Sequence, residues 1–158
     1  MLLLEIRPAT QDDIENISEL LCDLSERFIT GDFSSEGKQT LLETLTPEGI
    51  EKSMQSGFRY HVAEEDDQLV GVVGMKENSH LYHLFVAEGF QRRGIARKLW
   101  QVAMKECLEK GNPGEFTVNS SSYAQGAYEK LGFVSVSGPM EKGGVVFFPM
   151  KLIITRQQ

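Results

Sequence analysis

The 158-residue sequence has few of the features that mark extracellular or membrane proteins. Its two cysteines, Cys22 and Cys107, form no CxxC motif, so we expect packing thiols in a reducing cytosol rather than a disulfide framework or a zinc ribbon. The apolar run at residues 2–4 ends at once in charged residues, so it is too short for a signal peptide or a membrane span. These absences predict a cytoplasmic protein that does not engage membranes.

Basic residues are also scarce, since 16 lysines and arginines face 23 aspartates and glutamates, for a net charge of −7. Nucleic-acid binding needs lysine and arginine to replace counterions, so no nucleic-acid partner is expected. The apolar share of 41% and charged share of 25% are typical of a soluble globular protein. At this length the chain is predicted to form one domain, residues 1–158.

The hydrophobic pattern predicts strands that first pair as hairpins and then alternate with helices, as in a mixed sheet with helices on both faces. No period is visible at residues 29–45. The strongest helical pattern, residues 93–110, places Ile95, Leu99, Val102, Ala103 and Leu108 on one face. The expected strands are residues 2–7, 60–64, 69–75, 81–86, 116–118 and 145–154, and the other expected helices are residues 10–28, 46–56 and 123–131.

Residues 86–97 join a predicted strand to the head of the longest predicted helix, where unpaired N–H groups favour an anion. Gly94 and Ala96 would let a phosphate approach the backbone, and three arginines add positive charge. Neither a P-loop nor a GxGxxG motif is present. On the residues alone, this segment is either an anion-binding loop or a basic loop that merely caps a helix.

The spacing Gln91-x-x-Gly94-x-Ala96 resembles the pyrophosphate loop of the GCN5-related N-acetyltransferase (GNAT) superfamily. The resemblance implies an α/β (α+β) fold with a mixed, mostly antiparallel central sheet of six to seven strands and helices on both faces. It implies acetyl-CoA as co-substrate, with backbone pairing of the strand end to the pantetheine arm and acetyl carbonyl. The implied contacts are Leu84, Phe85 and Val86 on the strand, and Gln91, Arg92, Arg93, Gly94, Ile95, Ala96 and Arg97 on the phosphates.

Residues 124–133, Ala-x-x-x-Tyr-Glu-Lys-x-Gly-Phe, resemble the second signature of the same superfamily. Without the family, Tyr128 is an aromatic residue on a helix, and such residues are more often core than catalytic. The resemblance makes Tyr128 the acid that protonates the departing thiolate, and it adds Lys130 to the cofactor contacts. The asparagine that often stands seven positions before the tyrosine is Ser121 here, so either Asn119 or Ser121 contacts the pantetheine.

Family members often carry a carboxylate base on the strand before the loop, but residues 80–86 contain none. His83 is the best replacement because a histidine accepts a proton near neutral pH, and Tyr82 acting through water is second. Alternation along a strand predicts that these two side chains lie on opposite faces. His83 is equally well explained as a core histidine. His80 and His83 diverge on a strand, so no metal site is expected.

The sequence therefore predicts an N-acetyltransferase that moves an acetyl group directly from acetyl-CoA to a primary amine of a small molecule or peptide. A non-catalytic coenzyme A sensor and a plain interaction module are the alternatives. Residues 28–58 are the expected acceptor side, and the aromatic residues there fit a cleft or a core equally well. The acidic run at residues 64–67 is typical of a solvated turn, although it could attract a cationic acceptor. The resemblance also allows a homodimer, since family members often pair.

Overall fold

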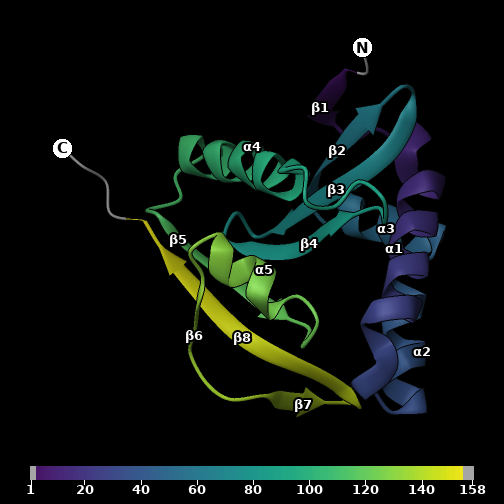
Figure 1. Ribbon diagram of the computed structural model, residues 1–158, viewed down its shortest axis with the longest axis vertical. Coiled ribbons are helices and arrows are strands. Elements are labelled where there is room, and N and C mark those ends of the chain that lie inside the picture. The colour runs from purple at the N-terminus through teal and green to yellow at the C-terminus, as the bar shows by residue number, and fades with distance from the viewer. Residues whose placement is uncertain (1–2, 155–158) are drawn as a thin grey trace.

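The computed structural model describes residues 3–154, which form eight strands and five α-helices (Figure 1). Leu2, where the first strand was predicted to begin, lies outside the described residues. The strands are β1 (Leu4–Pro8), β2 (Arg59–Glu65), β3 (Gln68–Lys76), β4 (His80–Val86), β5 (Glu115–Ser120), β6 (Val134–Ser135), β7 (Met140–Lys142) and β8 (Val145–Ile153). The helices are α1 (Ile14–Phe28), α2 (Ser35–Thr44), α3 (Pro47–Gln55), α4 (Ile95–Glu109) and α5 (Gln125–Lys130), with short 3-10 turns at Gln11–Asp13 and Thr30–Asp32.

The strands form one sheet in the order β1-β2-β3-β4-β5-β8-β6, and β7 pairs with the free part of β8. Every neighbouring pair is antiparallel except β4 and β5, which are parallel. This confirms the predicted mixed, mostly antiparallel sheet. The sheet exceeds the predicted six to seven strands because β6 and β7 have only two and three residues, too few to show a period of two.

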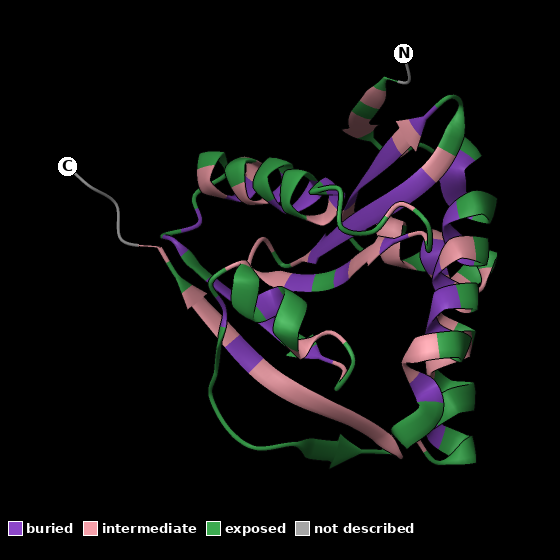
Figure 2. Cartoon of the chain, in the orientation of Figure 1, coloured by how far each residue is buried: buried purple, intermediate pink, exposed green. Residues whose placement is uncertain are grey.

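Helices cover both faces of the sheet, as predicted, and each face has its own apolar cluster. Figure 2 shows that β2 and β3, between the two layers of helices, are buried along most of their length. Helices α4 and α5 pack on one face, whereas α1 and α3 pack on the other. The change of face is visible at consecutive residues of β3, since Val72 belongs to the α1–α3 cluster and Val73 to the α4–α5 cluster. Both side chains are fully buried, so the centre of β3 separates the two layers.

Local capping signals place several element ends where the sequence predicted them. Thr46 caps α3, because its hydroxyl accepts a hydrogen bond from the N–H of Gly49 at 3.1 Å. Gly57 follows that helix with φ of 99°, a conformation that glycine adopts without strain. Asp66 and Asp67 also have positive φ, 54° and 62°, and form the tight turn between β2 and β3.

Helix α2 was not predicted, because residues 29–45 show no apolar period. Ser34 caps this helix by accepting a hydrogen bond from the N–H of Gly37 at 3.0 Å. The helix is also held by the β7–β8 turn, since the Ser34 N–H donates to the Gly144 carbonyl at 3.1 Å. A Cβ on Gly37 would lie 2.1 Å from that same carbonyl oxygen. The helix therefore depends on a contact with residues far away in the sequence.

Helix α4 buries a slightly different stripe from the predicted one. Ile95, Leu99 and Ala103 are buried as expected, but Val102 is 36% exposed and points away from the core. Trp100 and Cys107 are buried instead. The ring of Trp100 meets those of Phe116 and Phe133 at centroid distances of 5.1 and 5.5 Å, and this aromatic contact fixes the rotation of the helix on the sheet.

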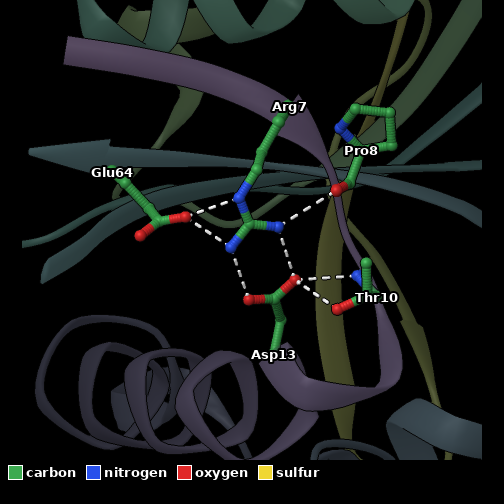
Figure 3. Close-up of polar contacts among 5 residues, drawn as sticks. All are labelled: Arg7, Pro8, Thr10, Asp13 and Glu64. Atoms are coloured by element: carbon green, nitrogen blue, oxygen red, sulfur yellow. Dashed lines mark hydrogen bonds and ion pairs between the residues drawn. The ribbon is translucent and has the colours of Figure 1, made fainter. Parts of the chain in front are cut away.

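An ion-pair cluster ties the start of the chain to the edge of the sheet (Figure 3). Arg7 on β1 donates two parallel hydrogen bonds of 2.8 Å to the carboxylate of Asp13, and its guanidinium also pairs with Glu64 on β2. Asp13 accepts a further hydrogen bond from the Thr10 N–H at 2.7 Å. These bonds lower the pKa of Asp13, chiefly through Arg7, which favours the ionised carboxylate.

Candidate active site

Strands β4 and β5 diverge after a short stretch of pairing, which opens an edge of the sheet. Their parallel pairing consists of His80 with Thr117 and Leu81 with Val118. Beyond these pairs, β4 continues to Val86 paired on its other side with β3. The edge of Leu84, Phe85 and Val86 that faces β5 is therefore outside any ladder, as the resemblance implied. An extended ligand can pair with this edge.

The segment between β4 and α4 turns sharply at three residues with positive φ, which are Gly89 at 91°, Arg92 at 66° and Gly94 at 78°. Gly94 is the N-cap of α4, and a Cβ built on it would meet nothing within 4 Å. The first N–H groups of α4 have no acceptor within the helix. Together with the helix dipole they favour an anion, and the space in front of Gly94 is open.

The three arginines of this region have different surroundings. Arg93 Nη2 lies 2.7 Å from Glu65 Oε2, and its guanidinium lies 5.4 Å from the centroid of the Phe90 ring. Arg97 Nη2 donates a 2.9 Å hydrogen bond to the Lys130 carbonyl at the end of α5. Arg92 makes no hydrogen bond or ion pair within residues 3–154. Of the three predicted phosphate contacts, only Arg92 has an uncommitted side chain.

Gln91 holds the segment onto the end of β4, because its Nε2 donates a 3.1 Å hydrogen bond to the Val86 carbonyl. The resemblance counts Gln91 among the phosphate contacts, and in the structure its side-chain amide is engaged with this carbonyl. The acidic run also differs from the predicted solvated turn. Glu65 is 3% exposed and bound to Arg93, and Glu64 is bound to Arg7, so only the next two aspartates are solvated.

Tyr128 lies on α5 with its ring against that of Phe133, at a centroid distance of 5.8 Å. Burial raises the pKa of the phenol, so the hydroxyl stays protonated at neutral pH. Within residues 3–154 the hydroxyl makes no hydrogen bond, and the residue is 8% exposed. Tyr128 Oη–H is therefore a donor without a partner in the described part of the chain.

The two candidates for the pantetheine contact differ in what their side chains do. Asn119, near the end of β5, is exposed, and its amide has no hydrogen-bond partner in the described part of the chain. The Ser121 hydroxyl accepts a 3.1 Å hydrogen bond from the Ala124 N–H and so stabilises the turn into α5. Asn119 is thus the freer of the two. The Lys130 side chain is exposed, and its carbonyl is the group that engages Arg97.

The prediction that Tyr82 and His83 lie on opposite faces of β4 is wrong. Gly74 pairs with His83 and Met75 with Leu81, so Tyr82 is an extra residue, a β-bulge, opposite β3. The bulge turns both side chains to the same side, with ring centroids 4.4 Å apart. The Tyr82 ring packs edge-on against Phe58, whose neighbours belong to the α1–α3 cluster. Both residues therefore face the expected acceptor side.

His83 itself is buried, and its Nδ1 lies 3.2 Å from the Tyr60 hydroxyl. Burial lowers the pKa of His83 to about 3, so the imidazole is neutral at physiological pH. These contacts are those of a hydrogen-bonded core histidine. Its role as a base stays a prediction, and protonating it carries a large desolvation cost.

The end of α1 and the 3-10 turn at Thr30–Asp32 contact both segments that border the divergent strands. Arg27 lies 3.2 Å from Glu88 in the segment after β4. The Phe28 ring stacks on Tyr123 in the turn after β5, with centroids 5.0 Å apart. Asp32 accepts a 2.6 Å hydrogen bond from the Ser122 hydroxyl. No sequence pattern indicated these contacts, because each joins residues more than 60 positions apart.

Comparison with known proteins identifies the family. Residues 29–154 match the acetyltransferase (GNAT) domain family, so the chain belongs to that family. The PaiA N-acetyltransferase of Thermoplasma acidophilum, solved in complex with coenzyme A, superimposes with a TM-score of 0.79, 21% identity, and coverage of 96% of this chain and 99% of that one. A GCN5-related N-acetyltransferase of Rhodopseudomonas palustris gives 0.78, 20% identity and 95% coverage of each chain. YncA of Salmonella typhimurium with acetyl-CoA gives 0.68, 18% identity and coverage of 99% and 96%.

Within residues 3–154 no helix is long and apolar enough to cross a membrane. In the same range, no group of three or more histidine, cysteine, aspartate and glutamate side chains is arranged to hold a metal ion. The absence of a metal from the reaction stays a prediction.

Proposed function

We propose that this chain is an acetyl-CoA-dependent N-acetyltransferase that transfers the acetyl group directly to a primary amine of a small molecule or peptide in a ternary complex. The observation that carries the proposal is the divergence of β4 from β5 beside the N-terminus of α4. The open edge of β4 can pair with the amides of a ligand, and the N-terminus of α4 can bind the phosphates of the same ligand. Coenzyme A has both kinds of group on one chain.

The residues present fit such a ligand. The open space in front of Gly94 and the free N–H groups of α4 suit a pyrophosphate, and Arg92 can add a cation. The edge from Leu84 to Val86 suits the amides of the pantetheine arm. Asn119, with its uncommitted amide, is the side chain we assign to the same arm.

Tyr128 is the residue that we assign as the general acid. When the amine nitrogen forms the new C–N bond and the C–S bond breaks, the departing sulfur needs a proton. Tyr128 Oη–H, protonated and without a hydrogen-bond partner in the described chain, can donate it and later recover one from solvent. A thioester bound between β4 and α4 would supply the acyl group. The strand edge would orient it, and Tyr128 would supply the proton.

The proton on the attacking amine has to leave by another route. His83 is neutral but costly to protonate, whereas Tyr82 beside it is 36% exposed to solvent. We therefore propose that water at Tyr82 carries the amine proton away and that His83 lines the acceptor side. This order of roles follows from burial, since solvent takes up a proton without the desolvation that His83 would incur.

Two measurements test the proposed function. Titration calorimetry with coenzyme A should give saturable binding, and thiol release from acetyl-CoA should appear with at least one pool of amines drawn from polyamines, amino acids, aminoglycosides and short peptides. Binding without turnover in any pool would favour the coenzyme A sensor. No binding would refute the cofactor assignment. Light scattering on the same sample checks the predicted homodimer.

A further inference from the structure

Glu65, the last residue of β2, has a carboxylate that is almost fully buried, with 3% of the residue exposed. The next two residues, Asp66 and Asp67, form the exposed tip of the same hairpin. An ionised carboxylate removed from water is unfavourable unless an opposite charge and hydrogen bonds compensate for lost hydration. Glu65 Oε2 receives a 2.7 Å charge-assisted hydrogen bond from Arg93 Nη2, which is its one ion pair within residues 3–154.

Arg93 belongs to the segment that precedes α4, so this bond ties the β2–β3 hairpin to the N-terminus of that helix. The adjoining Arg92 has φ of 66°, a left-handed conformation that is unfavourable for a non-glycine residue. Such a backbone persists when neighbouring contacts hold it. Two side chains do so here, with Gln91 on the Val86 carbonyl and Arg93 between Glu65 and the Phe90 ring.

We propose that Glu65 is a positioning residue for cofactor binding, and that Arg93 is its counter-ion rather than a phosphate ligand. Glu65 fixes Arg93, and Arg93 fixes the backbone that presents the N–H groups of α4. Arg92, with no partner in the described chain, is then the arginine of this segment that meets the phosphates. The inference rests on the proposed function, because it assigns how the same site recognises coenzyme A.

The direction in which coenzyme A affinity changes when Glu65 is removed separates a positioning role from a purely electrostatic one. Glu65 carries a negative charge near the proposed phosphate site, so its removal should tighten coenzyme A binding if charge alone mattered. If Glu65 positions the segment, its removal loosens the site and weakens binding. Asp67 offers a matched control, because it carries the same charge two residues further on and has no ion pair among the described side chains.

The first experiment compares Glu65→Gln with Asp67→Asn by calorimetric titration with coenzyme A. We expect Glu65→Gln to raise the Kd by about tenfold. Asparagine suits the positive φ of 62° at position 67, so Asp67→Asn should keep the Kd within about twofold of the unmodified chain. A Glu65→Gln variant that is folded and binds coenzyme A as tightly as Asp67→Asn would overturn the proposal.

A second experiment combines Glu65→Gln with Arg93→Gln. Under the proposal Glu65 and Arg93 act as one unit, so adding Glu65→Gln to Arg93→Gln should change the Kd for coenzyme A by less than about twofold. If Glu65 and Arg93 acted independently, the second change would weaken binding again. A double variant whose Kd is about tenfold higher than that of Arg93→Gln would overturn the proposal.

A kinetic readout separates positioning from general loss of structure. In the thiol-release assay, Glu65→Gln should raise the KM for acetyl-CoA about tenfold and leave kcat within about twofold, because the acid and the acceptor side are unchanged. A tenfold fall in kcat with an unchanged KM for acetyl-CoA would contradict the assignment. If the unmodified chain itself binds no coenzyme A, the proposed function fails first, and that result is distinct from each outcome above.

Discussion

The substitution Tyr128→Phe removes one oxygen atom from the molecule and keeps the ring that packs against Phe133. The structure gives that oxygen no hydrogen bond within residues 3–154, so the free energy of unfolding should change by less than about 1 kcal/mol. A general acid typically accelerates a reaction by about 10²–10⁴-fold, and proton donation by solvent can replace part of that acceleration. We expect kcat to fall about 10- to 1000-fold, equivalent to about 1.4–4 kcal/mol in the activation free energy.

The assay is thiol release from acetyl-CoA with a reactive amine, run beside chemical unfolding and coenzyme A titration of the same variant. The Kd for coenzyme A should stay within about threefold, because Oη serves the departing sulfur and not the phosphates. Tyr123→Phe makes the same chemical change at an exposed tyrosine whose ring stacks on Phe28, and it should leave kcat within about twofold. If Tyr128→Phe retained full kcat, or lost more than about 2 kcal/mol of stability, the reasoning would be refuted.

Three further predictions concern stability and pH. Asp13→Asn should lower the free energy of unfolding by about 2 kcal/mol at pH 7, and the deficit should shrink in urea titrations below about pH 4, because the lowered pKa of Asp13 makes its contribution disappear as that carboxylate is protonated. Gly37→Ala should lower the free energy of unfolding by about 1–3 kcal/mol, because the new Cβ clashes with the Gly144 carbonyl. Gly126→Ala should not destabilise the protein, because a Cβ there meets nothing within 4 Å, and equal urea midpoints for the two variants would contradict this prediction. Finally, kcat/KM should rise from pH 6 to 9 without an inflection near 6.5, since His83 does not titrate there; such an inflection would restore it as the base.

Much of the fold was predictable because its signals are short-range. The hairpin from β2 to β3, the cap at Thr46 and the position of α4 each depend on residues within a few positions of one another. The turn before α4 is also local, since the left-handed Gly94 and the helix that follows it are adjacent in sequence. For the same reason, both motifs that carried the family resemblance could be found without a structure.

The features that were missed depend on contacts between distant residues. Helix α2 has no clear period and is held by the β7–β8 turn through Gly144. Glu65 looked solvated because two aspartates follow it, and only the fold brings Arg93 to its carboxylate. The bulge at Tyr82 arises from the register between β3 and β4, which no residue of β4 encodes alone.

That bulge has a chemical consequence for the acceptor. It gathers Tyr82 and His83 on one side of β4, the strand on which family members often carry a carboxylate, and His83 is neutral at physiological pH. Without a fixed base, the reactive fraction of an acceptor is the fraction already deprotonated. At pH 7.5 that is about a third of a terminal α-amine but only about a tenth of a per cent of a lysine-type amine. We therefore expect an acceptor whose amine is weakly basic, which makes peptide N-termini better first candidates than polyamines.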